Sequence, residues 1–369
     1  MKINCWICKS SKVIELNISR KISLATDGTI LKQRLSKVQC INCGLFFNPN
    51  TITINNYHRS SGDSKWDIQR HKDIAKNISK IIKKIFSAKK KKISVLEIGG
   101  GNYLTSYFLS KINKKLSVTC LEPYPENDAS KSGVECLKLK LEDYLPKKKF
   151  EFVFSNNVIE HTSNPVKFIK NIDKLLSEKS FILVCCPTQT KITNETLFID
   201  HFFHFSEQSF KMIANKAGFV LEKEFISSWD QFTHCYLLKK AKKHKKIKNR
   251  ISPKTAIMQR KSIIDKYRIL DDQLLNKLIN FKGKVYLFGA GEFSQIIRCY
   301  APKFFDRLSS IVVSDQKGSR LFNKKINLIR DIKPNSGVIG VGVREDMANK
   351  VLNNLLKLGW SKNKIIKIN

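Results

Sequence analysis

Long apolar runs and acidic side chains are both scarce in this sequence. No stretch approaches the roughly 20 consecutive apolar residues that a membrane-spanning helix needs, so we expect no membrane span. The N-terminal residues MKINCWICKS lack the apolar core of a secretory signal peptide. From both absences we expect a cytoplasmic protein.

The shortage of acids leaves a strongly basic chain. Lys and Arg number 68 against 31 Asp and Glu, which gives a formal net charge of +37. Such a surface attracts anions, which include nucleic acids, anionic lipids and phosphorylated small molecules. The excess is mostly Lys and is spread along the whole chain, with runs at 89–92 and 239–246. Solvated lysine-rich faces explain this pattern, so the charge alone does not predict a nucleic-acid-binding protein.

Length and composition predict a chain of three parts. The 369 residues exceed the roughly 100–200 residues of one domain, and 42% apolar residues suffice for more than one core. We expect an N-terminal zinc-binding region over 1–62, a central domain over 63–240 and a smaller C-terminal domain over 241–369. The basic, apolar-poor stretch 239–252 predicts a linker or the exposed start of a helix between the last two.

The central part alternates short β-rich runs with helical periods. Such alternation predicts βαβ units and a mainly parallel sheet that is covered on both faces. The expected strands are Ile93–Ile98, Ser117–Leu121, Val134–Leu139, Phe150–Ser155, Phe181–Cys186 and Phe219–Ile226. The expected helices are Tyr103–Lys114, Pro165–Ser177 and Ser206–Ala217. A helix over about 255–280 and strands at Lys284–Phe288, Ser309–Ser314 and Gly337–Val343 predict a second, smaller α/β unit.

Four of the ten cysteines form two C-x-x-C pairs, Cys5 with Cys8 and Cys40 with Cys43. Each such turn offers two thiolates, and four thiolates match the tetrahedral preference of Zn²⁺. A redox dithiol is the alternative, but one C-x-x-C would be enough for it. Because the protein would fill all four coordination positions, the sequence predicts a structural zinc site rather than a catalytic one.

A glycine turn lies between an expected strand and an expected helix in the segment VLEIGGG, residues 95–101. Such turns let the backbone approach a ligand closely in NAD, FAD and S-adenosylmethionine (SAM) enzymes alike. The acid Glu97 inside the motif is distinctive, because it can organise an ammonium group, which NAD lacks. Glu122, 21 residues after Gly101 and directly after a β-like run, is placed to accept two ribose hydroxyls.

These residues resemble the cofactor motif of class I SAM-dependent methyltransferases. The resemblance continues in order through FEFVFSNNVIEHTSNPVKFIKNIDKLLSEKSFILVCCP, residues 150–187. This part is similar to the family's fourth strand, its V-x-E-H helix start, the next helix and the fifth strand ending in Pro. The resemblance implies a Rossmann-like fold with SAM as cofactor. It assigns Glu97, Gly99 and Gly101 to the methionine end, Glu122 to the ribose, Glu142 to the adenine and Asn156 to the surroundings of the methyl group.

The chain departs from this family at Asn102-Tyr103, where a third glycine is usual. A bulky residue there either crowds the cofactor or reflects a turn that is one residue shorter. The departure motivates a non-enzymatic alternative, a binding or scaffold protein with a degenerate SAM site.

The segment Phe198-Ile199-Asp200-His201, followed by His204, carries the candidate base. The order of C-x-x-C pairs, SAM domain, this segment and a second Rossmann-like domain resembles the zinc-containing sugar C-methyltransferases. Those enzymes act on nucleotide-linked keto-sugars. Their Tyr-x-Glu-His motif is matched in part: the His is kept, Glu becomes Asp200 and Tyr becomes Phe198.

Carbon methylation beside a ketone needs a base for an acidic C–H, a task that suits imidazole. We expect His201 to be the base, Asp200 to orient it and His204 to be a further catalytic candidate, with a packing histidine as the alternative for His204. O-methylation needs only a base near a hydroxyl, so both C- and O-methylation stay open. The expected acceptor is a small molecule, a phosphorylated or nucleotide-linked sugar or a glycan precursor.

A second glycine turn, Gly289-Ala290-Gly291-Glu292-Phe293-Ser294, follows an expected C-terminal strand, with Asp315 further on. It predicts either a nucleotide moiety at a helix N-terminus or a turn kept for close packing. In the sugar C-methyltransferases the matching domain helps to hold the nucleotide-sugar.

An RNA methyltransferase is the other enzymatic alternative, suggested by the charge and the cysteines. Base N-methylation often uses an Asn/Asp-Pro-Pro-aromatic motif after the fourth strand, whereas this chain has Ser155-Asn156-Asn157-Val158. Aromatic and basic residues also do not concentrate in one RNA-binding module. We therefore expect no nucleic-acid partner.

Overall fold

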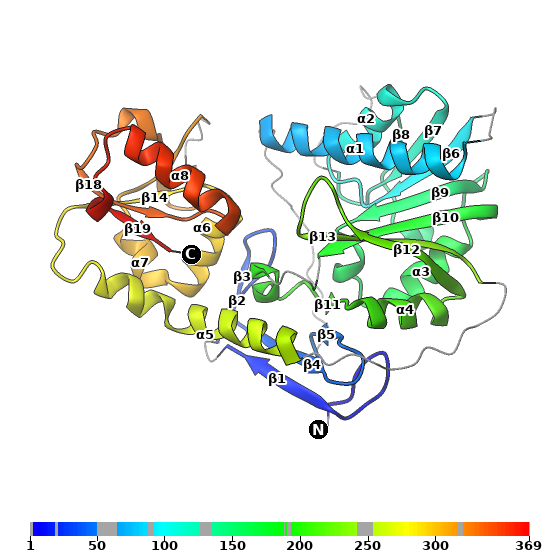
Figure 1. The fold of residues 1–369 in the computed structure, drawn as a ribbon, viewed down its shortest axis with the longest axis horizontal. Helices are drawn as coiled ribbons and strands as arrows, with labels where there is room; N and C mark the ends of the chain where they lie inside the picture. The colour runs from blue at the N-terminus through cyan, green and yellow to red at the C-terminus, as the bar shows by residue number, and fades with distance from the viewer. Residues whose placement is uncertain are drawn as a thin grey trace. The chain divides into compact units, whose positions relative to one another are not determined.

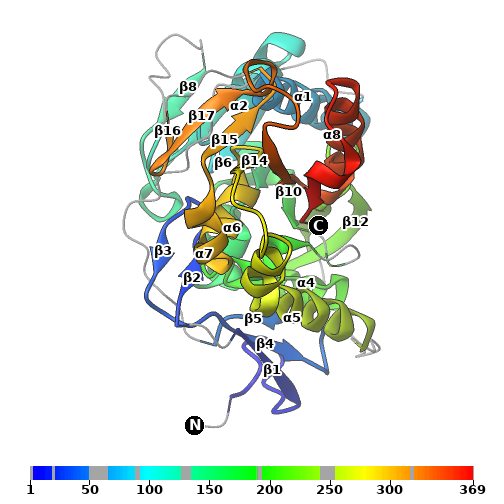
Figure 2. The same ribbon diagram turned by 90° about the vertical axis from the view of Figure 1, so that its left-hand side faces the viewer.

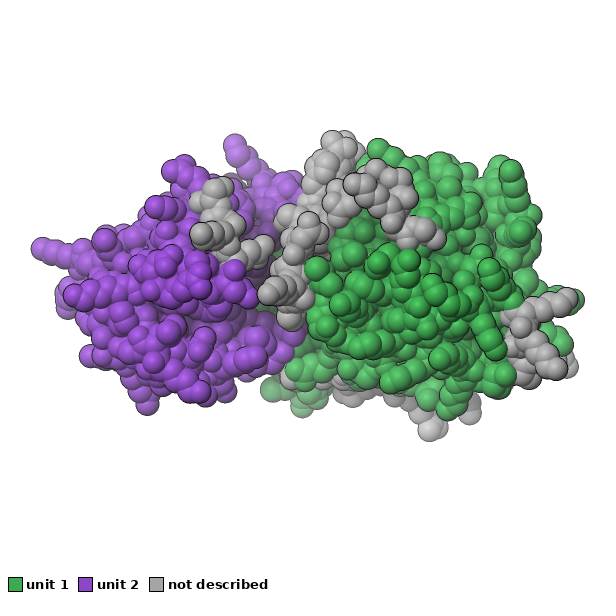
Figure 3. Space-filling view, turned by 90° about the horizontal axis from the view of Figure 1, so that it is seen from above, with its two compact units in different colours: residues 1–16, 36–260 green, residues 17–35, 261–369 purple. Residues whose placement is uncertain are grey.

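The computed structural model describes residues 3–18, 21–49, 65–87, 92–125, 134–187, 189, 193–241, 254–315 and 320–368. The chain forms two compact units, residues 1–16 with 36–260 and residues 17–35 with 261–369 (Figure 3). The short stretch 17–35 therefore belongs to the same unit as the C-terminal residues. The expected division at 62 and 240 stays a prediction, and its first boundary lies outside the described residues. Among the described helices, none is both long and apolar enough to cross a membrane.

A seven-stranded sheet forms the framework of the first unit (Figure 1). Its strands are β6 (Ile93–Ile98), β7 (Leu116–Leu121), β8 (Glu135–Leu137), β9 (Phe150–Asn156), β10 (Leu176–Pro187), β12 (Phe219–Ile226) and β13 (Thr233–Lys240). Their spatial order is β12-β13-β10-β9-β6-β7-β8. Neighbours pair in parallel except β13, which is antiparallel to both β10 and β12. Because β6, β7 and β9 are parallel, their C-terminal ends lie at one edge of the sheet.

Helices cover both faces of this sheet, because its strands are apolar on both sides. They are α1 (Lys65–Ile85), α2 (Leu104–Ile112), α3 (Pro165–Asp173) and α4 (Glu207–Lys216). Val95, Phe152 and Phe154 belong to the core on the α1 side, whereas Leu96 and Val153 belong to the core that includes residues of α3 and α4. Successive strand residues thus alternate between two cores, as the pleat requires.

A small sheet of the first unit joins the cysteine pairs to the histidine segment. Its order is β1-β4-β5-β11. The strands are β1 (Val13–Asn17), β4 (Ser36–Cys40), β5 (Phe46–Phe47) and β11 (Phe203–His204). In the antiparallel β5–β11 pair, Phe203 lies opposite Phe47 and His204 opposite Phe46. The N-terminal region is therefore paired with the residues that follow His201.

The second unit is built on a six-stranded sheet of order β16-β17-β15-β14-β18-β19. Its strands are β14 (Lys284–Phe288), β15 (Ser310–Val313), β16 (Arg320–Leu321), β17 (Lys324–Leu328), β18 (Gly337–Val341) and β19 (Ile365–Lys367), and a hairpin of β2 (Ser23–Leu24) and β3 (Ile30–Leu31) accompanies it. The sheet is parallel except for β16. Its helices are α6 (Glu292–Tyr300), α7 (Pro302–Arg307) and α8 (Glu345–Lys357) (Figure 2), and the boundary between the two units falls within α5 (Lys254–Asn276), after Arg260. The parallel sheets with helices confirm the expected α/β class.

Five short 3-10 helices complete the described elements: η2 (Leu141–Asp143), η3 (Ile159–His161), η4 (Asn194–Leu197), η5 (Ile329–Asp331) and η6 (Lys362–Lys364). One expectation needs correction at the start of the stretch 239–252. Lys239 and Lys240 are the last residues of β13, a strand that the sequence pattern missed, and they pair with β10 and β12. Residues 242–252 lie outside the described ones.

Candidate functional site

The turn after β6 has the backbone that its glycines predict. Gly99 and Gly101 have φ of 76° and 57°, in the left-handed region that favours glycine. A Cβ on Gly99 would lie 2.3 Å from Val158 Cγ2, and one on Gly100 would lie 2.1 Å from Cys120 Sγ. A Cβ on Gly101 would meet no atom within 4 Å. Packing therefore requires the first two glycines, whereas Gly101 borders open space.

Tyr103 stands where related turns have a third glycine, and it keeps a glycine-like backbone. It precedes α2 as its N-cap residue, with φ of 61° and ψ of 3°. This left-handed conformation costs an L-residue roughly 1–2 kcal/mol. The tyrosine is buried at 3% exposure, and burial raises the pKa of its hydroxyl. The chain thus keeps the turn with a buried aromatic ring in place of the missing glycine.

Glu97, near the end of β6, is a buried acid with 4% exposure. Its Oε2 accepts a hydrogen bond from the Ser106 hydroxyl, and Cys120 Sγ lies 3.8 Å from the same oxygen. Burial raises the pKa of Glu97 to about 7, although these hydrogen bonds favour the charged form. A ligand ammonium beside this carboxylate would offset the cost of burying its charge.

Glu122 follows β7 and contacts the glycine turn. Its Oε2 accepts from the Gly101 N–H at 2.9 Å, and its Oε1 accepts from the Tyr124 N–H at 2.9 Å. A carboxylate has about four lone-pair sites, so both oxygens can also accept hydroxyl protons. Glu142 is exposed on η2, and its contact with an adenine stays a prediction.

Asn156 ends β9 beside the glycine turn, because Ser155 of β9 lies opposite Ile98 of β6. Asn157 follows with a φ of 54°. The Oδ1 atoms of both asparagines are buried and have no hydrogen-bond partner among the described residues. An unsatisfied buried acceptor costs roughly 1–3 kcal/mol, which a bound donor would recover.

Together these residues fit a SAM molecule. The Glu97 carboxylate can pair with the ammonium group of SAM, and the Glu122 carboxylate can accept from the two ribose hydroxyls. The open side of Gly101 leaves room for the part of SAM that would lie against the backbone of the turn. Asn156 and Asn157 offer unpaired acceptors at the neighbouring strand end.

The four thiols of the C-x-x-C pairs form one cluster. The Sγ atoms of Cys5 and Cys43 are 3.5 Å apart, as are those of Cys8 and Cys40, and all four lie within 4.8 Å of one another. Sulfurs around a tetrahedral zinc with bonds of about 2.3 Å lie roughly 3.8 Å apart, so this spacing fits one zinc ion. The short contacts cross between the two C-x-x-C turns, unlike the pairing within one turn that a redox dithiol needs.

The cysteine region also holds the segment around His201. Ser206 Oγ donates to the Cys43 carbonyl at 2.7 Å. Asn48 donates from its backbone N–H to the Phe202 carbonyl at 2.9 Å and from its side-chain amide to the Ile199 carbonyl. Backbone and side-chain bonds therefore anchor both ends of the segment 199–206 to the N-terminal region.

The ring of His201 contacts an acid that the sequence pattern did not reveal. Its Nδ1 lies 2.9 Å from Oε2 of Glu195, which lies in η4. Burial lowers the pKa of His201, but the acids Glu195, Asp200 and Glu160 together outweigh this effect, with Glu195 contributing most, so the pKa lies above its usual value. With Nδ1 beside Glu195, Nε2 is the ring nitrogen left for proton transfer.

The contact that we expected from Asp200 is made by Glu195, because adjacent side chains point in different directions. Asp200 Oδ2 instead lies 3.5 Å from Nδ1 of His161, and the Asp200 carbonyl oxygen lies 3.0 Å from the same nitrogen. The rings of His161 and His201 meet edge to face with centroids 4.6 Å apart. The structure therefore brings His161 of η3 beside the candidate base.

Glu160, His161 and His201 each bring one donor atom within 4.8 Å of the others. A divalent cation can bridge donors at such spacing, and one bound here would engage the histidine that we expect to act as a base. Whether the protein binds a divalent ion at this cluster therefore distinguishes a base role of His201 from a metal-ligand role.

In the second unit, close packing accounts for the first glycine of the C-terminal turn. Gly289 has φ of 113°, and a Cβ there would lie 2.6 Å from the Gly342 carbonyl oxygen. Ser294 Oγ donates to the Gly289 carbonyl. A Cβ on Gly291 would meet no atom within 4 Å, and Asp315 is exposed. The nucleotide role of this turn stays a prediction.

A comparison with protein families identifies the central part of the first unit. Residues 66–224 match a model described as a methyltransferase domain, which is under half of the chain. The Rossmann-like sheet, the glycine turn and this match define a class I methyltransferase domain. Residues 66–224 of the chain are therefore a methyltransferase domain. No curated protein is similar enough to count as its relative.

Solved structures similar to this chain include the mitomycin 7-O-methyltransferase MmcR, at 15% identity and a TM-score of 0.40, over 48% of this chain and 54% of that one. The chain thus spans about half the length of that protein. The plantazolicin methyltransferase BpumL in complex with SAH is similar at 14% identity and a TM-score of 0.38, over 48% of this chain and 86% of that one. The Burkholderia thailandensis 1,6-didemethyltoxoflavin-N1-methyltransferase is similar at 12% identity and a TM-score of 0.37, over 54% of this chain and 97% of that one.

Proposed function

We propose that this enzyme transfers a methyl group from SAM to a sugar, nucleotide-linked or part of a glycan precursor, at carbon or oxygen. The observation that carries the proposal is the contact of His201 with Glu195 beside η3. The start of η3 at Ile159, two residues after Asn157, supports a base near the strand end where the methyl group is expected.

SAM, when bound, supplies a methyl group on a positively charged sulfur. His201 Nε2 takes a proton from a C–H beside a ketone or from a hydroxyl of the acceptor. The electron pair left on the acceptor forms the new bond to the methyl carbon, and the bond between that carbon and sulfur breaks. Glu195 stabilises the imidazolium that forms, Asp200 contacts the neighbouring His161, and His204 is a further catalytic candidate.

The remaining residues of the proposed site bind SAM or stabilise the N-terminal sheet. Glu97, Gly99 and Gly101 hold the methionine end, Glu122 the ribose and Glu142 the adenine. The four cysteines hold a structural zinc ion, which stabilises a small sheet with little core of its own. A phosphorylated acceptor suits the basic chain, and the cytoplasm is the compartment in which such acceptors and reduced thiols occur together.

The test incubates the zinc-loaded full chain with methyl-labelled SAM and, in separate reactions, a panel of nucleotide-linked sugars and an RNA preparation, and mass spectrometry locates the label. We expect one sugar to gain one methyl group and His201→Ala to lose at least a hundredfold in kcat while it still binds SAM. His234→Ala, a change of another buried histidine on β13, is the matched control and should stay active. Undiminished turnover by His201→Ala would exclude the base, and a labelled RNA with no labelled sugar would exclude the acceptor class.

A further inference from the structure

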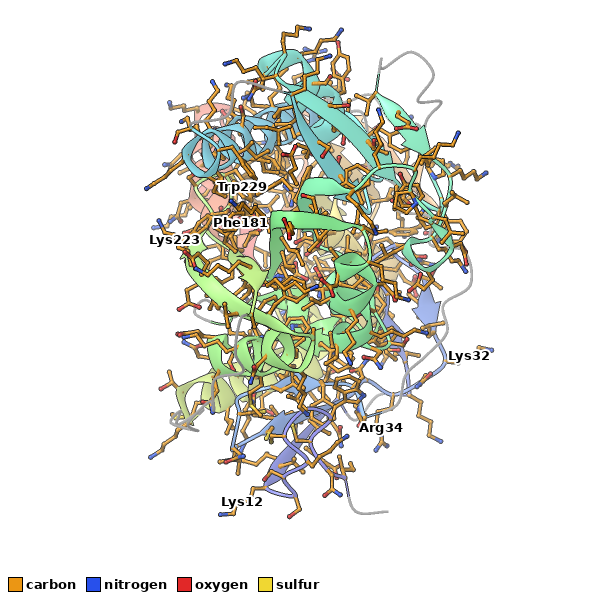
Figure 4. All side chains as sticks on the ribbon, turned by 90° about the vertical axis from the view of Figure 1, so that its right-hand side faces the viewer. Lys12, Lys32, Arg34, Phe181, Lys223 and Trp229 are labelled. Atoms are coloured by element: carbon orange, nitrogen blue, oxygen red, sulfur yellow. The ribbon has the colours of Figure 1, made fainter. Side chains whose placement is uncertain are left out.

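Lys37 lies in β4 with 0% exposure, unlike the other described lysines before it, which are exposed. Lys12 and Lys32 are exposed and extend into solvent (Figure 4). Burying an ammonium group is costly unless the group is paired and hydrogen-bonded. The partners of Lys37 therefore indicate its role.

Both of its hydrogen-bond partners belong to the histidine segment. Lys37 Nζ donates to the His201 carbonyl at 2.5 Å and lies 3.3 Å from Nε2 of His204. The His204 ring packs against Phe46 of β5 with centroids 5.2 Å apart, and Lys37 Nζ lies 5.8 Å from the centroid of the same phenyl ring. One amine therefore joins β4 to the backbone of the base and to the ring of His204.

Charged and titratable groups surround this amine on the elements packed against β4. They are Glu195, Asp200, His201, His204 and Arg260. Burial lowers the pKa of Lys37 to about 7, which Asp200 opposes and Arg260 reinforces. Burial and the facing Lys37 hold the pKa of His204 well below its usual value. His204 is therefore neutral near pH 7, so Nε2 accepts from Lys37 and Nδ1 carries the ring hydrogen.

We propose that Lys37 is a positioning residue, which fixes the backbone at His201 and holds His204 in its Nδ1–H tautomer. This inference rests on the proposed function, in which His201 is the base. Lys37 shares β4 with Cys40, so the cysteine-bearing sheet sets the geometry of the base through this side chain. The N-terminal region then has a role in the reaction besides its own folding.

The test needs no acceptor. Histidine in the zinc-loaded full chain is labelled with ¹⁵N, and the seven histidines are followed by NMR between pH 5.5 and 8. Wild-type His204, assigned through His204→Gln, should stay neutral with its hydrogen on Nδ1 below pH 7, where Lys37 carries its proton. A wild-type spectrum with the hydrogen on Nε2 would overturn the proposal without any change at Lys37.

Lys37→Met removes the donor and keeps an unbranched side chain. We expect His204 to become a mixture of tautomers and to titrate nearer its usual pH, while zinc content and SAM affinity stay within twofold of wild type. With the acceptor, kcat should fall at least tenfold with little change in KM for SAM. Lys12→Met, an exposed lysine, is the matched control and should change none of these.

Two outcomes separate this proposal from the proposed function. A folded, zinc-containing Lys37→Met protein with unchanged His204 signals would overturn the positioning role alone. Full turnover by His201→Ala would exclude His201 as the base and so overturn the proposed function. A change of the His204 tautomer in Lys37→Met would then still show the contact between Lys37 and His204 that the structure describes.

Discussion

Replacing Glu97 with Gln should stabilise the free protein and weaken its binding of SAM. Burial raises the pKa of Glu97 from its usual 4.5 to about 7 in the folded state. Between these two values the folded chain keeps a proton that the unfolded chain has lost, so stability falls as the pH rises through this window. The shift of roughly 2.5 pKa units corresponds to about 3 kcal/mol.

Glu97→Gln removes this term but keeps a polar group for Ser106. The variant should match the wild type in free energy of unfolding at pH 4.5 and exceed it by about 3 kcal/mol above pH 7. Urea unfolding at pH 4.5, 6 and 7.5 measures the difference. Glu178→Gln, an exposed change on β10, is the control and should differ little from wild type at any of these pH values.

SAM binding should change in the opposite direction, because only the ionised carboxylate pairs with an ammonium group. For the wild type, affinity should fall roughly tenfold from pH 7 to pH 5.5 as Glu97 gains its proton, a range in which an α-amino group stays charged. Glu97→Gln should bind SAM weakly and without this pH dependence, as isothermal titration calorimetry would show. A variant that is less stable above pH 7, or that binds SAM as tightly as the wild type, would refute the reasoning.

Three further changes test other parts of the site. Gly99→Ala should destabilise the domain by more than 2 kcal/mol through its clash, whereas Gly101→Ala should cost about 1 kcal/mol of unfolding free energy but reduce SAM affinity more than tenfold. Metal analysis should find one zinc ion per chain, and Cys40→Ser should lose this ion together with N-terminal structure. If the wild type also holds a second divalent ion that His201→Ala lacks, His201 is a metal ligand and not the base. Glu195→Gln should lower kcat and move the acidic limb of the pH–rate profile to lower pH, because Glu195 raises the pKa of His201; an unmoved limb would contradict that pairing.

Local patterns in the sequence predicted several of the strands that carry the expected cofactor residues. The bounds of β6 and β12 agree with expectation, because each is an apolar run that ends at a turn. The glycine turn and its acids lie close together in the sequence, and the parallel sheet brings Glu122 back to Gly101. The missed strand β13 ends in the lysines at 239 and 240, whose charge made them resemble a linker.

The base half of the site depends on contacts that no local pattern contains. Strands β5 and β11 have two residues each, so they show no periodicity, and only their pairing makes them strands. Glu195 is an acid in a short 3-10 helix, and only its contact with the ring of His201 marks it as a candidate site residue. Lys37 is one of 68 basic residues, and among those that the structure describes only Arg260 is also buried.

A crystal structure of the full chain with S-adenosylhomocysteine tests the central claim most directly, since it places the cofactor on the residues that should hold it. We predict the amino end beside Glu97, the ribose hydroxyls on Glu122 and the sulfur near Asn156, with one molecule per chain. A structure determined with saturating S-adenosylhomocysteine in which the sheet edge at Gly101 is empty, or in which the cofactor binds elsewhere, would contradict the account.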